Sequence, residues 1–125
     1  MKLLLVDDDA FLRDMYATKF SEFDHAVDVA ESPAQALLKL QQDPSFDVIL
    51  LDMIMPGMTG VELMNTIIET YPDNKAKFIV LSNQGQTEDI DEAMKAGALG
   101  YIIKAESIPS DVVKKVEELA GKKKK

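Results

Sequence analysis

The chain has 125 residues, no cysteine and a formal net charge of −8, and without the four lysines of residues 122–125 the remainder carries −12. This acidity argues against nucleic-acid binding because phosphates would be repelled, and the lack of cysteine, which excludes thiol chemistry, fits a cytoplasmic protein. The N-terminal apolar run, residues 3–6, ends in three aspartates, and no run approaches the roughly 18 residues of a membrane span. We therefore expect no signal peptide and no membrane partner. The length predicts one domain, placed at residues 1–121, followed by a solvated lysine tail at residues 122–125.

Strands and helices are expected to alternate along the chain. The strands are expected at residues 2–6, 25–30, 46–52, 77–82 and 99–104. The helices are expected at residues 10–23, 33–42, 60–70, 87 or 88–96, and 109–120. Asp9 is expected to cap the first helix, Ser32 and Pro33 to begin the second, and Gly97 to end the fourth. The apolar face of the first helix is expected to contain Leu12, Tyr16, Phe20 and Phe23. This alternation predicts an α/β fold, a parallel sheet covered by helices on both faces.

Two apolar runs are typical of strands buried on both faces, and carboxylates follow each of them. The runs and their carboxylates are residues 3–6 with Asp7, Asp8 and Asp9, and residues 48–51 with Asp52. If these strands are parallel neighbours, their carboxyl ends lie at the same edge of the sheet and the four carboxylates converge there. Such a cluster repels itself and needs a cation. Oxygen ligands without a nearby histidine or cysteine suit Mg²⁺, completed by water and a phosphate oxygen.

Four separated motifs together resemble the receiver domain of two-component response regulators. They are VDDD after the first strand, LLDMIMPGMTG after the third, IVLSNQ at the fourth and YIIKAE at the fifth. They occur in the order of that family with near-standard spacing, over about residues 2–121. The resemblance implies a flavodoxin-like (βα)5 sandwich with the sheet order 2-1-3-4-5. It also implies a phosphoprotein of phosphorelay signal transduction, which accepts a phosphoryl group from a histidine kinase or phosphotransfer protein and then switches partner binding.

The resemblance assigns the acceptor and the metal ligands residue by residue. Asp52 matches the aspartate that forms the aspartyl phosphate. A carboxylate is a weak nucleophile, so it must be held in line with phosphorus while the charge on the phosphoryl oxygens is neutralised. Asp8 would bind Mg²⁺ directly, Asp7 through a water, and Asp52 through one oxygen. The backbone carbonyl of Ile54 would be a further ligand.

Three other residues match family residues that contact the phosphoryl group or move after phosphorylation. Lys104 matches the lysine that pairs with the acidic site and then holds a phosphoryl oxygen, and Ser82 the hydroxyl that donates to the phosphoryl group. Tyr101 matches the switch aromatic that turns inward when Ser82 moves. Read without the resemblance, these are a surface lysine, a turn serine and a half-buried tyrosine. The output surface would be residues 87–120, which bind a downstream protein or a second copy, so the chain is a monomer or a phosphorylation-dependent dimer.

Two positions depart from the family pattern. Ala105 follows Lys104 where the family usually has a proline joined by a cis bond, and Asn83 follows Ser82 where the family prefers a small residue. A cis bond before a residue other than proline costs about 2.5–4 kcal/mol, so we expect the Lys104–Ala105 bond to be trans. Asn83 is expected to narrow access to Asp52 or to alter the range of partners.

His25, the only histidine, is expected to be an exposed residue at the start of the second strand, far from the acidic edge, which argues against a role as phosphodonor. The methionines near Asp52 are expected to fill gaps in the packing rather than to form a recognition surface. They are Met53, Met55 and Met58.

Three other functions fit the sequence less well. An aspartate-nucleophile phosphatase would place its nucleophile after the first strand in a D-x-D arrangement followed by Thr or Val, whereas Ala10 and Phe11 follow here, and the chain has no room for a substrate cap. A flavodoxin-like FMN carrier would need a phosphate-binding loop where three aspartates stand. A pseudo-receiver that binds partners without phosphorylation is disfavoured because the expected acceptor, metal and lysine positions are all intact.

Overall fold

The computed structural model describes residues 1–83 and 85–121, and the expected lysine tail lies outside this described part. Five parallel strands form one sheet in the order β2-β1-β3-β4-β5. The strands are β1 (Lys2–Val6), β2 (Ala26–Ala30), β3 (Val48–Leu51), β4 (Lys77–Ser82) and β5 (Ala98–Ile103). The helices are α1 (Ala10–Glu22), α2 (Pro33–Gln42), α3 (Gly60–Thr70), α4 (Thr87–Ala96), the short 3-10 helix η1 (Lys104–Glu106) and α5 (Pro109–Leu119). The expected fold class and strand order are confirmed.

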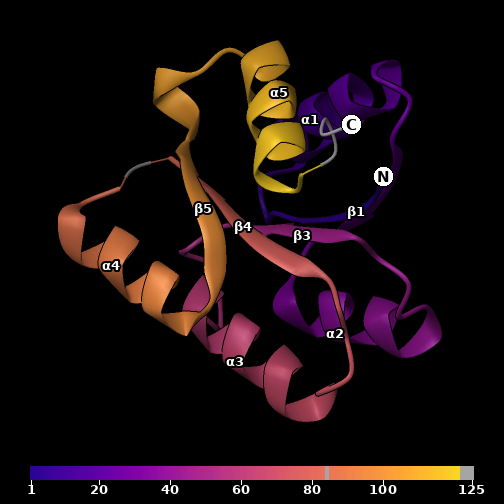
Figure 1. The fold of residues 1–125 in the computed structure, drawn as a ribbon, viewed down its shortest axis with the longest axis vertical. Coiled ribbons are helices and arrows are strands. Elements are labelled where there is room, and N and C mark those ends of the chain that lie inside the picture. The colour runs from indigo at the N-terminus through magenta and orange to yellow at the C-terminus, as the bar shows by residue number, and fades with distance from the viewer. Residues whose placement is uncertain (84, 122–125) are drawn as a thin grey trace.

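Helices cover both faces of the sheet, with α1 and α5 on one face and α2, α3 and α4 on the other (Figure 1). The central strand β3 is buried throughout because its side chains alternate between the two layers. Val48 and Leu50 pack with α1 and α5, while Ile49 and Leu51 pack with α2 and α3. The continuous apolar run therefore reflects burial on both faces, as expected.

Local signals account for most helix ends. Asp9 caps α1 by accepting a hydrogen bond from the backbone N–H of Leu12 at 3.1 Å, and Ser32 caps α2 in the same way. Gly97 ends α4 with φ 117°, a left-handed conformation that glycine adopts without steric cost. Each of these expected roles is confirmed.

Several boundaries differ from the expected ones. The fifth strand ends at Ile103, which pairs with Ser82 at the end of β4, so Lys104 has no ladder partner and the chain turns into η1. The third strand is shorter at both ends than residues 46–52. The first helix ends at Glu22, and Phe23 is exposed at its C-cap instead of joining the apolar face.

His25 was expected to be exposed, but it is buried. It precedes β2, and its Nε2 lies 2.7 Å from a carboxylate oxygen of Glu117 on α5. Its Nδ1 lies 3.0 Å from the amino group of Met1, and its ring packs edge-on against Phe20. The prediction was wrong because the cover over His25 comes from α5, far away in sequence.

Candidate functional site

Three aspartates gather at the carboxyl edge of the sheet. Asp7 follows β1 and Asp52 follows β3, and these strands are hydrogen-bonded neighbours in register. Ligand oxygens of Asp7, Asp8 and Asp52 all lie within 4.8 Å of one another. Asp7 and Asp52 are buried, whereas Asp8 is exposed. Hard oxygen donors this close, without histidine or cysteine among them, are a donor set that could hold a divalent cation such as Mg²⁺.

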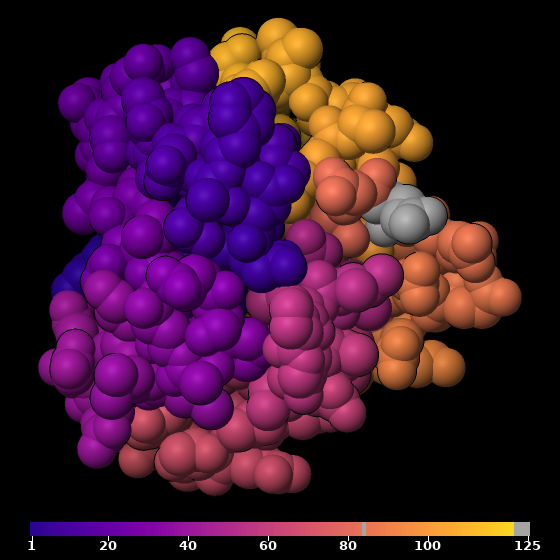
Figure 2. Space-filling model, turned by 180° about the vertical axis from the view of Figure 1, so that it is seen from behind, coloured from indigo at the N-terminus to yellow at the C-terminus, as the bar shows by residue number. Residues whose placement is uncertain are grey.

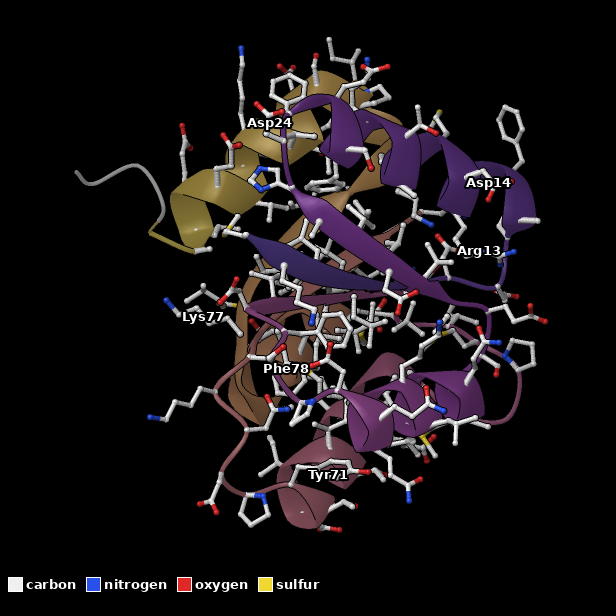
Figure 3. The ribbon with its side chains drawn as sticks, turned by 90° about the vertical axis from the view of Figure 1, so that its right-hand side faces the viewer. Arg13, Asp14, Asp24, Tyr71, Lys77 and Phe78 are labelled. Atoms are coloured by element: carbon white, nitrogen blue, oxygen red, sulfur yellow. The ribbon has the colours of Figure 1, made fainter. Side chains whose placement is uncertain are left out.

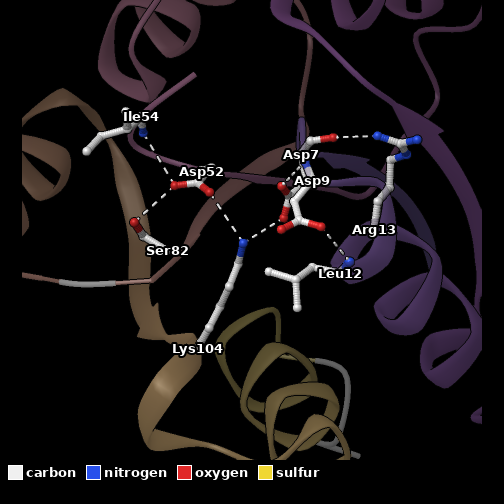
Figure 4. Close-up of polar contacts among 8 residues, drawn as sticks. All are labelled: Asp7, Asp9, Leu12, Arg13, Asp52, Ile54, Ser82 and Lys104. Carbon is white, nitrogen blue, oxygen red and sulfur yellow. Dashed lines mark hydrogen bonds and ion pairs between the residues drawn. The ribbon is translucent and has the colours of Figure 1, made fainter. Parts of the chain in front are cut away.

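Lys104 reaches this cluster from the first residue of η1. Its Nζ donates to an oxygen of Asp7 at 2.6 Å and to Oδ2 of Asp52 at 3.3 Å (Figure 4). Burial alone would lower the pKa of Lys104, but the hydrogen bond with Asp7 and the charges of Asp52 and Asp7 outweigh it, so the pKa is raised. Lys104 is therefore a buried cation, and the three carboxylates still outnumber it.

The carboxylate of Asp52 is held on both oxygens. Its Oδ1 accepts from the hydroxyl of Ser82 at 3.0 Å and from the backbone N–H of Ile54 at 3.3 Å, while Oδ2 faces Lys104 (Figure 4). Three donors from three different segments thus orient one side chain. The expected role of the Ile54 carbonyl as a metal ligand stays a prediction.

Asp52 lies at a pocket of about 300 Å³ that opens at the carboxyl edge. The pocket is lined by Asp7, Asp8, Asp9, Asp52, Ile54, Ser82, Asn83 and Lys104. In Figure 2 the early residues of the chain, the segment after β3 and the end of β4 meet on this face. Asn83 is exposed and lines the pocket, and its expected effect on access or on the range of partners stays a prediction.

Tyr101 connects the pocket to the surface of β5. It is half-buried, and its ring lies against the backbone of Gly85, where an added Cβ would come within 2.8 Å of it. Burial raises the pKa of Tyr101, a side-chain hydrogen bond with Ser82 lowers it, and the charges of Asp89 and Asp52 raise it further. Since Ser82 also bonds to Asp52, the three side chains form a chain from the pocket to β5.

Two residues that support the site escaped the sequence analysis. A Cβ at Gly60 would lie 2.4 Å from the carbonyl oxygen of Asp52, so only glycine allows α3 to begin this close. Arg13 donates through Nη1 to the carbonyl oxygen of Asp7 at 2.9 Å and holds the loop after β1 (Figure 4). Gly60 closes the LLDMIMPGMTG motif, eight residues after Asp52, and that position is the sequence signal for it, whereas nothing local marks Arg13.

Two expectations near the site are confirmed, one about a peptide bond and one about the packing of methionines. No peptide bond between described residues is cis, so the Lys104–Ala105 bond is trans, and Lys104 still reaches both carboxylates. Met53 and Met55 are buried in the core and Met58 packs against it.

A five-stranded parallel sheet in this order, with an acidic pocket at its carboxyl edge, defines a flavodoxin-like protein of the receiver type. Residues 3–117 match the family model described as the response regulator receiver domain. The chain belongs to this family, whose members are signalling domains rather than enzymes in the usual sense.

Relatives and solved structures agree with this assignment. The chain is 36% identical over 110 residues to the chemotaxis protein CheY of Halobacterium salinarum, covering 87% of this chain and 88% of that protein. It is 33% identical over 118 residues to the transcriptional regulatory protein ResD of Bacillus subtilis, covering 94% of this chain but 47% of ResD. The structure of the chemotaxis protein CheY4 of Vibrio cholerae superimposes with a TM-score of 0.86 at 28% identity, covering 94% of this chain and 97% of that one.

The chain thus spans most of the length of some relatives and about half the length of others. Within residues 1–83 and 85–121, no helix combines the length and the apolar character needed to cross a membrane.

Proposed function

We propose that this chain is a phosphorylation switch in which Asp52 accepts a phosphoryl group from the phosphohistidine of a histidine kinase or phosphotransfer protein. An oxygen of Asp52 forms a bond to phosphorus while the P–N bond to the donor imidazole breaks, and the electron pair of that bond returns to the imidazole nitrogen. The observation that carries the proposal is the orientation of Asp52, whose two carboxylate oxygens face donors from three segments at an open pocket.

The remaining site residues neutralise the charge that would repel a phosphoryl group. Lys104 is a buried cation beside Asp52 and can form an ion pair with a phosphoryl oxygen. Ser82 can donate a hydrogen bond from its hydroxyl to a second phosphoryl oxygen. Asp7, Asp8 and Asp52 are close enough to hold Mg²⁺, and the carbonyl of Ile54 would be a further ligand. When bound there, the ion supplies positive charge at the phosphoryl oxygens. The only catalysis proposed is of the chain's own phosphorylation and dephosphorylation.

Ser82 and Tyr101 would transmit the effect of phosphorylation to the protein surface. A phosphoryl group at Asp52 gives Ser82 a new acceptor, and the contact chain from Asp52 to Tyr101 transmits its movement to β5. The surface made by α4, β5 and α5 would then bind a downstream protein or a second copy. Phosphorylation shifts that equilibrium only if this surface binds its partner better in the phosphorylated form. Ile90 and Met94 offer apolar contacts on α4, where Met94 is exposed.

The other properties follow from the same function. A histidine-kinase donor and the absence of cysteine favour the cytoplasm, and the charge of the domain, at residues 1–121, opposes nucleic-acid binding. No contact in the described part of the chain favours the phosphatase or the FMN carrier.

The test is phosphorylation by acetyl phosphate with and without Mg²⁺, followed by mass spectrometry to locate the modified residue. We expect Mg²⁺-dependent modification at Asp52 and none in Asp52→Asn, which keeps the shape of the side chain but removes the nucleophile. Asp47→Asn is a matched control, because Asp47 lies just before the opposite end of the same strand. Modification of Ser82 or Thr59 in place of Asp52 contradicts the proposal.

A further inference from the structure

A second pocket, of about 830 Å³, lies at the amino edge of the sheet, where the strands begin. It is formed by the loop between α2 and β3, the loop between α3 and β4, and the end of α5. Tyr71 and Lys77 mark the two ends of the loop between α3 and β4 (Figure 3). No residue lines both this pocket and the one at Asp52. The volume is typical of a small-molecule site, and we call it the amino-edge pocket.

Rings from both loops line the amino-edge pocket. Pro44 and Phe46 come from the loop between α2 and β3, and Tyr71 and Pro72 come from the loop between α3 and β4. Phe46 is buried and Tyr71 packs against the same layer of the core, so both side chains are supported from behind. Aromatic and proline rings present flat apolar surfaces. These walls favour a ligand with a planar apolar body.

Asn74 supplies a hydrogen-bond donor that is not used within the described part of the chain. Its Oδ1 accepts from the backbone N–H of Ala76 at 2.7 Å, which fixes the orientation of the amide. Its Nδ2 is buried and has no hydrogen-bond partner among the described residues. An unpaired buried donor is unfavourable, so a ligand that brings an acceptor to Asn74 gains affinity.

The charged groups of the pocket favour a negative acceptor. Lys75 and Lys77 are exposed, and neither forms an ion pair with a described residue, although Nζ of Lys77 donates to the backbone carbonyl at the C-cap of α5 at 3.3 Å. Of the two carboxylates that line the pocket, Asp47 accepts from the backbone N–H of Lys2 at 2.8 Å. Asp73 is exposed and is the weaker influence, because two ammonium groups and the amide donor oppose it.

We propose that the amino-edge pocket binds a small aromatic carboxylate. Its ring system would pack against Phe46 and Tyr71, and its carboxylate would accept from Nδ2 of Asn74 and face Lys75 and Lys77. The inference goes beyond the proposed phosphorylation of Asp52 and does not depend on it. It concerns binding only, because phosphoryl transfer is assigned to the opposite edge of the sheet.

The experiment uses three probes that share one naphthalene ring and differ in charge. They are 2-naphthoate, 2-naphthamide and 2-naphthylmethylammonium, each titrated into the isotope-labelled chain while its amide chemical shifts are recorded. We expect saturable shifts for naphthoate, concentrated in residues 44–47 and 70–77. The Kd of naphthoate should be about fivefold lower than that of the amide and about tenfold lower than that of the ammonium probe.

Asn74→Asp tests the unpaired donor directly. The aspartate keeps an oxygen for the N–H of Ala76 but replaces Nδ2 with a second, negatively charged oxygen. The Kd of naphthoate should therefore rise at least about tenfold. Asn65→Asp is the matched control, because it makes the same chemical change at an exposed residue of α3 that does not line the pocket, and it should leave the Kd unchanged. Thermal unfolding confirms that both variants are folded.

Two further variants separate the charge of the pocket from the opposite edge of the sheet. Lys75→Gln removes one exposed cation and should raise the Kd of naphthoate about threefold. Asp52→Asn should bind naphthoate as the wild type does, since Asp52 does not line the amino-edge pocket.

Four results would overturn the proposal. The first is a lack of saturation up to about 5 mM naphthoate, well above the dissociation constants expected for a weak small ligand. The second is equal affinity for the ammonium probe, and the third is a shift pattern centred on the pocket at Asp52. The fourth is an Asn74→Asp variant that binds naphthoate as tightly as the wild type.

Discussion

Ionisable groups meet around a buried side chain both at the amino edge of the sheet, where the strands begin, and at the carboxyl edge, where they end, but only one group is balanced in charge. At the amino edge, His25 lies between the amino group of Met1 and the carboxylate of Glu117, one cation and one anion. At the carboxyl edge, Lys104 faces Asp7 and Asp52, with Asp8 beside them. Figure 3 shows the two edges, with Arg13 near the carboxyl edge and Lys77 at the amino edge. Balanced groups tie the fold together, whereas excess charge is retained where a ligand is needed.

Pocket size does not identify the functional edge of the sheet. The amino edge has the larger pocket, about 830 Å³, lined by Phe46, Tyr71, Lys77 and neighbouring residues. The pocket at Asp52 is only about 300 Å³. The larger one lacks a convergent set of buried charges, so the arrangement of charged groups and not the volume identifies the functional edge.

The largest expected effect comes from removing the exposed carboxylate of the unbalanced edge. Asp8→Ala should lower Mg²⁺-dependent labelling by acetyl phosphate by about 1000-fold, because the phosphoryl charge is no longer neutralised. Its free energy of unfolding should change by less than about 1 kcal/mol, since Asp8 is a surface residue. Labelling kinetics and urea unfolding measure the two effects. A normal labelling rate in this variant would show that the metal assignment is wrong.

At the amino edge the expected effect is on stability alone. His25→Ala should lower the free energy of unfolding by about 3 kcal/mol, because it leaves a cavity and removes the hydrogen bond to Glu117. Labelling of Asp52 should continue at the wild-type rate in the folded protein. Urea unfolding and acetyl phosphate labelling test this together, and a loss of labelling would mean that the two edges are coupled.

Magnesium should act on the carboxyl edge only. At ten times its dissociation constant, Mg²⁺ should raise the free energy of unfolding by about 1.4 kcal/mol, as expected for a ligand that binds only the folded state. Asp8→Ala should remove this stabilisation and His25→Ala should retain it. Unfolding curves over a Mg²⁺ titration provide the measurement. Equal stabilisation of all three proteins would place the ion elsewhere.

The smallest predicted effect is a change in the free energy of unfolding whose sign should differ between the two edges. Without Mg²⁺, Asp52→Asn should raise the free energy of unfolding by about 1 kcal/mol, because it removes one carboxylate from an excess of negative charge. The same chemical change at the balanced edge, Glu117→Gln, should lower it by a similar amount, because it weakens a satisfied contact. Urea unfolding in a chelating buffer measures both. Changes of the same sign would mean that the two groups do not differ in balance.

The sequence by itself determined the layers of the fold and the position of the acidic edge. The apolar runs at residues 3–6 and 48–51 require burial on both faces, and parallel strands bring Asp7 and Asp52 to one edge. Asp9 and Gly97 mark helix ends through local geometry. The apolar runs and the caps depend on neighbouring residues, so sequence patterns were sufficient to predict them, whereas the strand order that makes β1 and β3 neighbours came from the family resemblance.

Only the tertiary structure decided which groups meet across the layers. His25 and Glu117 are 92 residues apart, so no local pattern reveals that α5 covers the histidine. The close approach of Gly60 to the Asp52 carbonyl and the bond from Arg13 to Asp7 depend on how α3 and α1 dock against the sheet. Such contacts are set by the packing of whole elements, and a shift of about 1 Å, too small to leave any trace in sequence periodicity, would break them.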